Sequence, residues 1–253
     1  MRGVWSVNRN DAPGTSRRRP GVTLGRRNVT RPQGRRLKQR LKKNAGRSPS
    51  SIRWLERQVN DIWTEGARRE GWRSRAAYKL IQLDERFSLM TPGNRVVDLG
   101  AAPGGWSQVA ASRVAGAPVI AVDVLEMESL AGVTIVAGDI RETLTRDVVI
   151  AALGGEADLV LSDMAAPSTG HRSTDHVRTQ ALAEEAHAFA VTVLAPGGCL
   201  VVKVLRGGAG NTLLSALRHD FARVHHVKPE ASRQQSSEIY VVARGFRRSA
   251  PRS

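Results

Sequence analysis

Two lysines and two carboxylates in this sequence could carry out chemistry together. Lys203 stands inside the apolar run Val201–Leu205, and a lysine is rarely buried without a partner. Asp163 follows another apolar run, Lys79 lies in an expected helix, and Glu238 opens an expected strand. If they converge, they could stage a proton transfer from a sugar hydroxyl, with Lys79 disfavouring and Asp163 favouring charge on Lys203. The alternative is that the stem of Lys203 packs while its ammonium reaches the sheet edge.

A glycine-rich turn, Asp98 to Trp106, follows an expected strand. Glycines at a strand-to-helix turn let the backbone approach a ligand and direct free helix N–H groups at it. The turn is not a phosphate-binding Walker motif, because no Gly-Lys-Ser/Thr follows, and Ala102 replaces the second glycine of a dinucleotide fingerprint. A nicotinamide cofactor is therefore disfavoured. A compact cofactor with a carboxylate, an amine and a nucleoside fits better.

Three acidic residues stand at or just after the ends of expected strands: Asp98, Asp123 and Asp139. Asp123 could accept hydrogen bonds from two ribose hydroxyls, and Asp139 could accept one from an adenine amino group. Each acid alone is typical of a helix cap or a turn. Three of them in register favour a nucleoside site.

These residues are positioned by short β-branched runs that alternate with helical patterns. The expected strands are Arg95–Leu99, Val119–Val124, Thr134–Ala137, Leu159–Ser162, Cys199–Leu205, Arg223–Lys228 and Ile239–Ala243. Helical patterns lie near 105–115, 141–153, 175–194 and 209–220. This alternation predicts an α/β fold whose mostly parallel sheet is covered by helices on both faces. The last two strands are too close in sequence for a helical crossover, so we expect them to pair antiparallel at one edge.

Two further helices are expected before the sheet. Ile52, Leu55, Val59 and Ile62 recur at helical spacing, which predicts the first. Ser74 is a plausible N-cap for the second, which should run to about Phe87.

The charge of the chain is unevenly distributed. Its 253 residues, 41% of them hydrophobic, suffice for one substantial core, and the net charge is +16. Residues 1–50 hold 15 Lys/Arg and one acid, whereas residues 51–253 hold 24 Lys/Arg and 22 acids. We therefore expect a disordered basic arm over 1–50, a folded domain over 51–248 and a short tail over 249–253.

Several classes of protein and site are excluded by composition. Cys199 is the single cysteine, which forbids an internal disulfide and a multi-cysteine zinc site and indicates a reducing, cytoplasmic compartment. The six histidines show no metal-ligand spacing, so no metal is expected. No apolar run approaches the roughly 18 residues that a membrane span requires. The amino terminus also lacks the apolar segment of a secretory signal.

The basic arm suits an electrostatic contact with nucleic acid, which gains affinity by releasing counterions from phosphates. A solvated tail or a mitochondrial transit peptide would share its composition, although Gly and Pro interrupt any amphipathic helix there. Within the domain, the arginines expected to contact RNA phosphates are Arg68, Arg69, Arg73, Arg75, Arg206 and Arg233.

Five segments together resemble the FtsJ/RrmJ family over about residues 72–246. They are 74–80 (SRAAYKL), 98–108 (DLGAAPGGWSQ), 161–165 (LSDMA), 201–204 (VVKV) and 237–240 (SEIY). The resemblance implies an S-adenosylmethionine-dependent methyltransferase with a Rossmann-like fold and a seven-stranded sheet that ends in an antiparallel hairpin. The implied substrate is a uridine of large-subunit (23S) ribosomal RNA, methylated on its ribose 2′-oxygen within the 50S particle. A monomeric enzyme is expected.

The resemblance also implies roles for individual residues. Its catalytic tetrad corresponds to Lys79, Asp163, Lys203 and Glu238, with Lys203 as the base, and its cofactor contacts correspond to Gly104, Trp106, Asp123, Asp139 and Asp163. Two alternatives stay open, namely the same chemistry on tRNA or a capped message, and an RNA-binding assembly factor without activity. The intact tetrad argues against the second, because a pure binding protein does not need Lys203 inside a strand.

Overall fold

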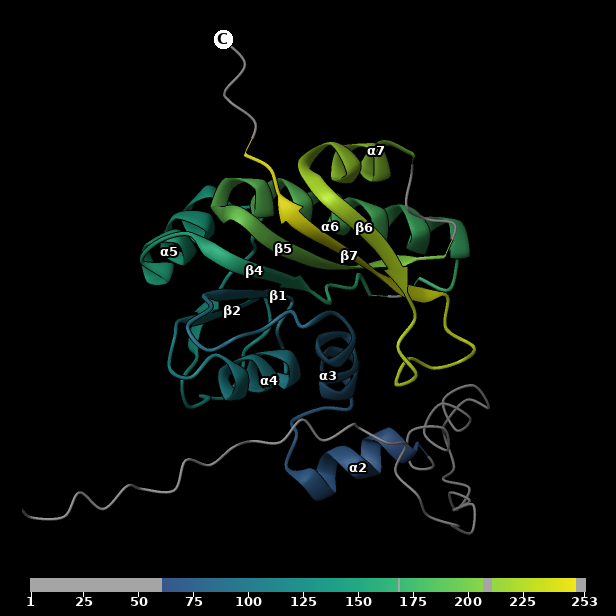
Figure 1. The fold of residues 1–253 in the computed structure, drawn as a ribbon. Coiled ribbons are helices and arrows are strands. Elements are labelled where there is room, and N and C mark those ends of the chain that lie inside the picture. Colours follow the sequence, from purple (N-terminus) through teal and green to yellow (C-terminus); the bar gives the residue numbers. More distant parts are fainter. Residues whose placement is uncertain (1–60, 168, 207–210, 249–253) are drawn as a thin grey trace, which may run out of the picture.

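The computed structural model describes residues 61–167, 169–206 and 211–248, and its centre is the expected seven-stranded sheet (Figure 1). The strand order is β3-β2-β1-β4-β5-β7-β6. The order reverses at β1, the strand that leads into the glycine-rich turn. The strands are β1 (Val96–Leu99), β2 (Val119–Asp123), β3 (Thr134–Ala137), β4 (Ala157–Ser162), β5 (Leu194–Leu205), β6 (Phe221–Val227) and β7 (Glu238–Phe246).

The last strand runs against its neighbours. β1 to β5 pair parallel, whereas β7 pairs antiparallel with both β5 and β6. The expected antiparallel hairpin is therefore present at one edge of the sheet, with β7 on its inner side and β6 on its outer side. Because β7 is reversed, it begins at the edge where the parallel strands end. Residues at the start of β7 can thus join a site built on those strand ends.

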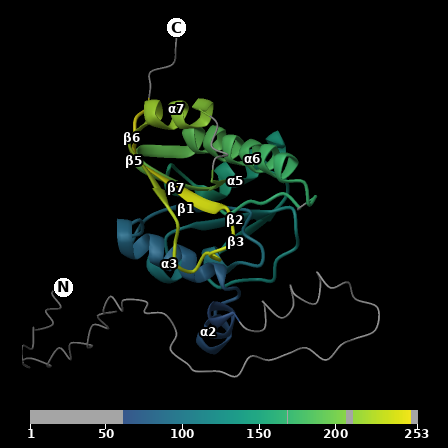
Figure 2. The ribbon, with the colours of Figure 1, turned by 90° about the vertical axis from the view of Figure 1, so that its right-hand side faces the viewer.

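Helices cover both faces of the sheet, as the alternating sequence pattern predicts (Figures 1 and 2). On one side lie α3 and α4, with α2 outside them, and on the other lie α5, α6 and α7. Their bounds are α2 (Ile62–Glu70), α3 (Ala76–Phe87), α4 (Gly105–Arg113), α5 (Thr143–Leu153), α6 (Arg172–Val193) and α7 (Asn211–Asp220).

Each face of the sheet has its own hydrophobic core, because successive strand residues point to opposite sides. Val202 of β5 packs in the core under α5, α6 and α7, whereas Val201 packs in the core under α2, α3 and α4. Tyr240 of β7 also belongs to the second core. By alternation, Lys203 shares the face of Val201 and therefore points towards α3, the helix that carries Lys79.

The start of α3 differs from the sequence prediction. Arg75, rather than Ser74, occupies the N-cap position, and the buried hydroxyl of Ser74 has no hydrogen-bond partner within the described residues. The reason is tight packing against α4, since a Cβ on Gly105 would lie 2.3 Å from Ser74 Oγ. The helix ends at Phe87 as expected.

Parts of the expected organisation lie outside the described residues. These are the basic arm, the tail over 249–253 and nearly all of the helix expected around Ile52–Ile62. The helix α2 starts only at Ile62, after the extended N-cap residue Asp61, and it is not among the helices expected from the sequence. In the described part of the chain, no helix combines the length and the apolar composition needed to cross a membrane.

Candidate active site

The four residues singled out from the sequence converge at the carboxyl ends of the parallel strands. Lys203 comes from β5, Glu238 opens β7, Lys79 comes from α3, and Asp163 directly follows β4. Tyr240 of β7 joins them through hydrogen bonds. We call these residues the five-residue cluster.

Among the residues that the structure describes, Asp163 alone holds the amine of Lys203. Its Nζ donates a hydrogen bond of 2.6 Å to the backbone carbonyl oxygen of Asp163 and lies 3.2 Å from Asp163 Oδ1. Only 5% of the Lys203 side chain is exposed. This geometry excludes the alternative in which its ammonium reaches into solvent at the sheet edge. A buried amine fixed by two acceptors is positioned rather than mobile.

Lys79 lies between the two carboxylates. Its Nζ is 3.6 Å from Asp163 Oδ2 and 3.6 Å from Glu238 Oε2. It also donates a 2.9 Å hydrogen bond to the hydroxyl of Tyr240, which in turn donates one of 2.7 Å to Asp163 Oδ1. Glu238 is the most exposed of the four, with 31% of its side chain accessible. It therefore forms the solvent side of the cluster.

Electrostatics fix the charge of Asp163. Burial alone would raise the pKa of this carboxyl group, but the positive charges of Lys79 and Lys203, with the hydrogen bond from Tyr240, hold the pKa below its usual value. For Tyr240 the direction is reversed, because burial and the nearby negative charges of Asp163 and Glu238 raise its pKa well above the usual value. At neutral pH the site thus contains a carboxylate at Asp163 and a protonated phenol at Tyr240.

The glycine-rich turn lies next to this cluster, and two of its glycines stand where a side chain would be strained and closely packed. Gly100 has a φ of +73°, and a Cβ there would lie 2.9 Å from the Cα of Met164, the residue after Asp163. Gly104 has a φ of +103° and is the N-cap of α4, so no side chain caps that helix. The first N–H groups of a helix have no intrahelical partner and favour an anionic ligand. A carboxylate-bearing cofactor fits this end of the turn.

The acidic residues at the strand ends gather around the same turn. Asp123 accepts hydrogen bonds from the N–H groups of Ala102 and Leu125, at 2.9 and 2.8 Å. This fixes its carboxylate beside the turn, with further lone pairs for ribose hydroxyls. Asp139 accepts from the backbone N–H and the guanidinium of Arg141, and the hydrogen bond from Arg141 lowers its pKa. Both carboxylates remain partly exposed.

Asp98 differs from these two because it is fully buried. Its Oδ2 accepts a 2.6 Å hydrogen bond from the hydroxyl of Ser107, while its Oδ1 has no partner among the described residues. Burial raises its pKa to about 7, despite the hydrogen bond from Ser107. Asp98 thus supports the turn from below rather than lining its open side.

Trp106 is placed differently from an exposed cofactor contact. Its side chain is buried, its Nε1 donates a 2.8 Å hydrogen bond to the carbonyl oxygen of Ala76, and its ring lies 5.5 Å from that of Tyr240. The indole therefore ties α3 to α4 under the site. Only the backbone of Trp106 can meet a ligand at the turn.

Sequence reasoning missed Tyr240 as a site residue, although the pattern contained a signal for it. Residues two apart in a strand point to the same face, so Tyr240 had to share the face of Glu238. The pairing of β5 with β7 adds a second constraint, because Lys203 and Tyr240 are direct partners across the two strands.

Four of the six arginines expected to contact RNA have partners within the protein. Arg69 pairs with Glu70 at 3.2 Å and Arg233 with Asp61 at 3.6 Å, whereas Arg73 and Arg75 are each held by several groups. Arg75 forms an ion pair with Asp61, donates to the carbonyl oxygen of Ala231, and leaves only 15% of its side chain exposed. Arg73 donates to three carbonyl oxygens of the loops around the glycine-rich turn. We therefore assign Arg73 and Arg75 to the scaffold. Arg68, Arg69 and Arg206 are exposed, and Arg233 is about one-third exposed.

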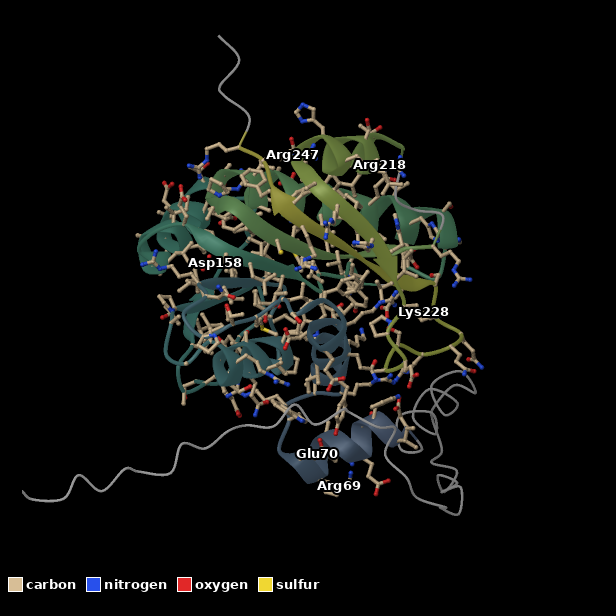
Figure 3. All side chains as sticks on the ribbon, in the orientation of Figure 1. Arg69, Glu70, Asp158, Arg218, Lys228 and Arg247 are labelled. Atoms are coloured by element: carbon tan, nitrogen blue, oxygen red, sulfur yellow. The ribbon has the colours of Figure 1, made fainter. Side chains whose placement is uncertain are left out.

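A cleft of about 750 Å³ lies between the start of α2 and the loop that joins β6 to β7. The cleft is lined by three basic residues, Arg75, Arg233 and Lys228, the last of which can be seen in Figure 3. Arg75 stands one helical turn before Lys79, and the charge of Glu238 acts on it. The cleft therefore lies on the side of the start of α3, and Arg75 is the lining residue nearest in sequence to the five-residue cluster.

Comparisons with known proteins identify the family of the chain. Residues 72–246 match the model of the family described as FtsJ-like methyltransferase. The chain is 53% identical over 226 residues to the ribosomal RNA large subunit methyltransferase E of Xanthobacter autotrophicus, covering 88% of this chain and 89% of the relative. It is also 53% identical to the protein of the same name from Zymomonas mobilis, covering 83% and 95% of the two chains.

A solved structure shows the same fold. It is described as a ribosomal RNA methyltransferase from Plasmodium falciparum and has a TM-score of 0.61 and 29% identity. The match covers 69% of this chain and 98% of that one. With the family match over the whole sheet, these findings establish that the chain belongs to the FtsJ-like methyltransferase family.

Proposed function

We propose that the protein transfers a methyl group from S-adenosylmethionine to the ribose 2′-oxygen of a uridine in large-subunit ribosomal RNA, with the 50S particle as substrate. The observation that carries this proposal is the buried amine of Lys203, held by Asp163 beside the glycine-rich turn. The relatives named as ribosomal RNA large subunit methyltransferase E support the choice of RNA.

Lys203 is the proposed base for the 2′-hydroxyl. In its free-amine form the side chain has two hydrogens and one lone pair. The carbonyl oxygen and Oδ1 of Asp163 account for the two hydrogens, so the lone pair is directed away from Asp163. Asp163 thereby orients the amine, and Lys79 lies 3.6 Å from the other oxygen of the same carboxylate. Glu238, at the solvent side, positions Lys79 and the ribose.

The residues around the glycine-rich turn fit the cofactor. The start of α4 at Gly104, which has no side-chain cap, suits the carboxylate of the cofactor. Asp123 can accept hydrogen bonds from its ribose hydroxyls, and Asp139 can accept one from its adenine amino group. When bound, S-adenosylmethionine supplies an electrophilic methyl group on a sulfonium, which requires no metal. Asp163 lies on the side of the turn that faces Lys203, so donor and acceptor can be aligned for in-line transfer.

The cleft beside Arg75 is the proposed contact surface for the RNA backbone, although Asp61 and Glu230 line it together with the basic residues. Lys228 and Arg233 reach it from the loop before β7. Together with the arm at residues 1–50, they supply positive charge for phosphates in a sequence-independent manner.

The test is transfer of labelled methyl groups from S-adenosylmethionine to 50S particles, free 23S RNA and tRNA in parallel. The proposal expects label in a 2′-O-methyluridine of the 50S particle. Label found only in tRNA would contradict the proposed substrate. Label on a base atom would contradict the proposed reaction. Absence of transfer to all three would leave only binding and contradict the proposed activity. Lys203→Ala protein serves as the control for contaminating enzymes.

A further inference from the structure

Arg73 occupies a position that joins three separate segments. It lies in the linker between α2 and α3, six residues before Lys79. Its Nη1 donates to the carbonyl oxygens of Pro103 and Glu128, at 3.2 and 2.8 Å, and its Nη2 donates to that of Ser129 at 2.5 Å. One guanidinium therefore bonds both the glycine-rich turn and the loop after β2.

The backbone of the linker is fixed to α4 as well. Arg73 N–H donates a 2.9 Å hydrogen bond to Gln108 Oε1, and Gln108 Nε2 donates one of 2.9 Å to the carbonyl oxygen of Gly71. Packing at the turn is equally close, because a Cβ on Gly104 would lie 3.0 Å from Arg73 Nη1 and 3.1 Å from Met127 Sδ. The side chain of Arg73 thus fills the space between Gly104 and the loop after β2.

We propose that Arg73 is a positioning residue for the cofactor. Its hydrogen bonds set the distance between the two loops that flank the cofactor site. The first loop holds Gly104, and the second follows Asp123, the expected ribose acceptor. A guanidinium suits this task, because its planar fork can donate to carbonyls in different directions while staying charged. Since α3 follows directly, the same contacts fix Lys79 relative to the cofactor. This inference rests on the proposed function for the identity of the cofactor.

The experiment compares Arg73→Ala and Arg73→Lys with Arg218→Ala. Arg218 is a matched control because it is exposed on α7, on the other side of the sheet (Figure 3). The dissociation constant of S-adenosylhomocysteine is measured by calorimetry without RNA. KM is then measured separately for S-adenosylmethionine and for 50S particles.

Arg73→Ala should raise the dissociation constant about tenfold, the size expected for loss of a charge-assisted hydrogen bond. KM for S-adenosylmethionine should rise in parallel, with KM for the particles unchanged. Arg73→Lys should give a smaller rise, because an ammonium keeps the charge but reaches fewer carbonyls, and Arg218→Ala should equal the wild type. Wild-type affinity in Arg73→Ala, or an equal rise in KM for the particles, would overturn the proposal.

Two further outcomes separate this proposal from the proposed function. If Arg73→Ala does not fold, Arg73→Lys decides, and unchanged affinity in that variant overturns the role of Arg73. If wild-type protein binds S-adenosylhomocysteine but methylates none of the RNAs, the proposed function fails, while the affinity series still supports or refutes the role of Arg73.

Discussion

Tyr240 and Lys203 are direct partners across the antiparallel β5–β7 pair, and both hold Asp163. The hydroxyl of Tyr240 donates to Asp163 Oδ1, and Lys203 Nζ donates to the backbone carbonyl of the same residue. Asp163 is thereby fixed from two adjacent strands. Because Tyr240 also accepts from Lys79, it connects the two lysines without being a base itself.

Replacing Tyr240 by Phe should slow methyl transfer while preserving the fold. The variant keeps the buried ring but loses the hydroxyl shared by Lys79 and Asp163. Charge-assisted hydrogen bonds contribute about 1.5–3 kcal/mol, so we expect kcat to fall about 10- to 100-fold. Initial rates on 50S particles measure this. Tyr78→Phe is the matched control, because Tyr78 is as buried but packs against Trp63. Equal rates for both variants would exclude a role for the hydroxyl.

Lys203→Ala should abolish transfer and leave S-adenosylhomocysteine binding nearly intact. Lys203→Arg tests the reason, because a guanidinium keeps the positive charge but cannot accept a proton at accessible pH. If Lys203 acts as a base, both variants are inactive in single-turnover assays. Substantial activity in Lys203→Arg would show that only the charge matters, and wild-type turnover in Lys203→Ala would refute the assignment.

Asp98→Asn should change how stability depends on pH. The pKa of Asp98 is raised from 3.8 to about 7 in the folded protein, so between these values the folded chain binds a proton that the unfolded chain has released. Stability must therefore fall as pH rises through this window, by on the order of 4 kcal/mol for Asp98 alone. The amide of Asn does not titrate in this pH range, so the variant lacks this contribution to the pH dependence. Urea unfolding at pH 5 and pH 8 should show a smaller loss in the variant, and identical losses would contradict the raised pKa.

Gly100→Ala should be more damaging than Gly116→Ala. Both glycines have positive φ, +73° and +85°, so each substitution carries a backbone strain of about 1–2 kcal/mol. At Gly100 the new Cβ would also meet the backbone of Met164, whereas at Gly116 nothing lies within 4 Å. Melting temperature should fall further for Gly100→Ala. Its activity should be lost as Asp163 shifts, while Gly116→Ala stays active.

Much of the site could be predicted from strand ends alone. Lys203 within an apolar run and Asp163 after another had to meet if β4 and β5 were parallel neighbours, and they are. The position of Glu238 follows from the reversal of β7, which the short β6–β7 connection indicated. The alternation of side chains along a strand and the register between paired strands are both readable from the sequence pattern, and together they predict which of these residues meet.

Other placements depend on contacts that the sequence does not display. Arg73 and Arg75 look like free phosphate ligands, because their acceptors are backbone carbonyls and a distant carboxylate. Ser74 has the residue type of an N-cap, yet close packing against Gly105 occupies its space. In each case a tertiary contact overrides a local preference.

The reversed direction of β7 has a consequence for when the enzyme becomes competent during its synthesis. Glu238 and Tyr240 are translated after every other member of the centre, and β7 separates β5 from β6. A nascent chain that stops short of this strand lacks two of the five groups and has a gap in its sheet. We therefore expect methyl transfer to begin only after β7 has been synthesised and has inserted between β5 and β6.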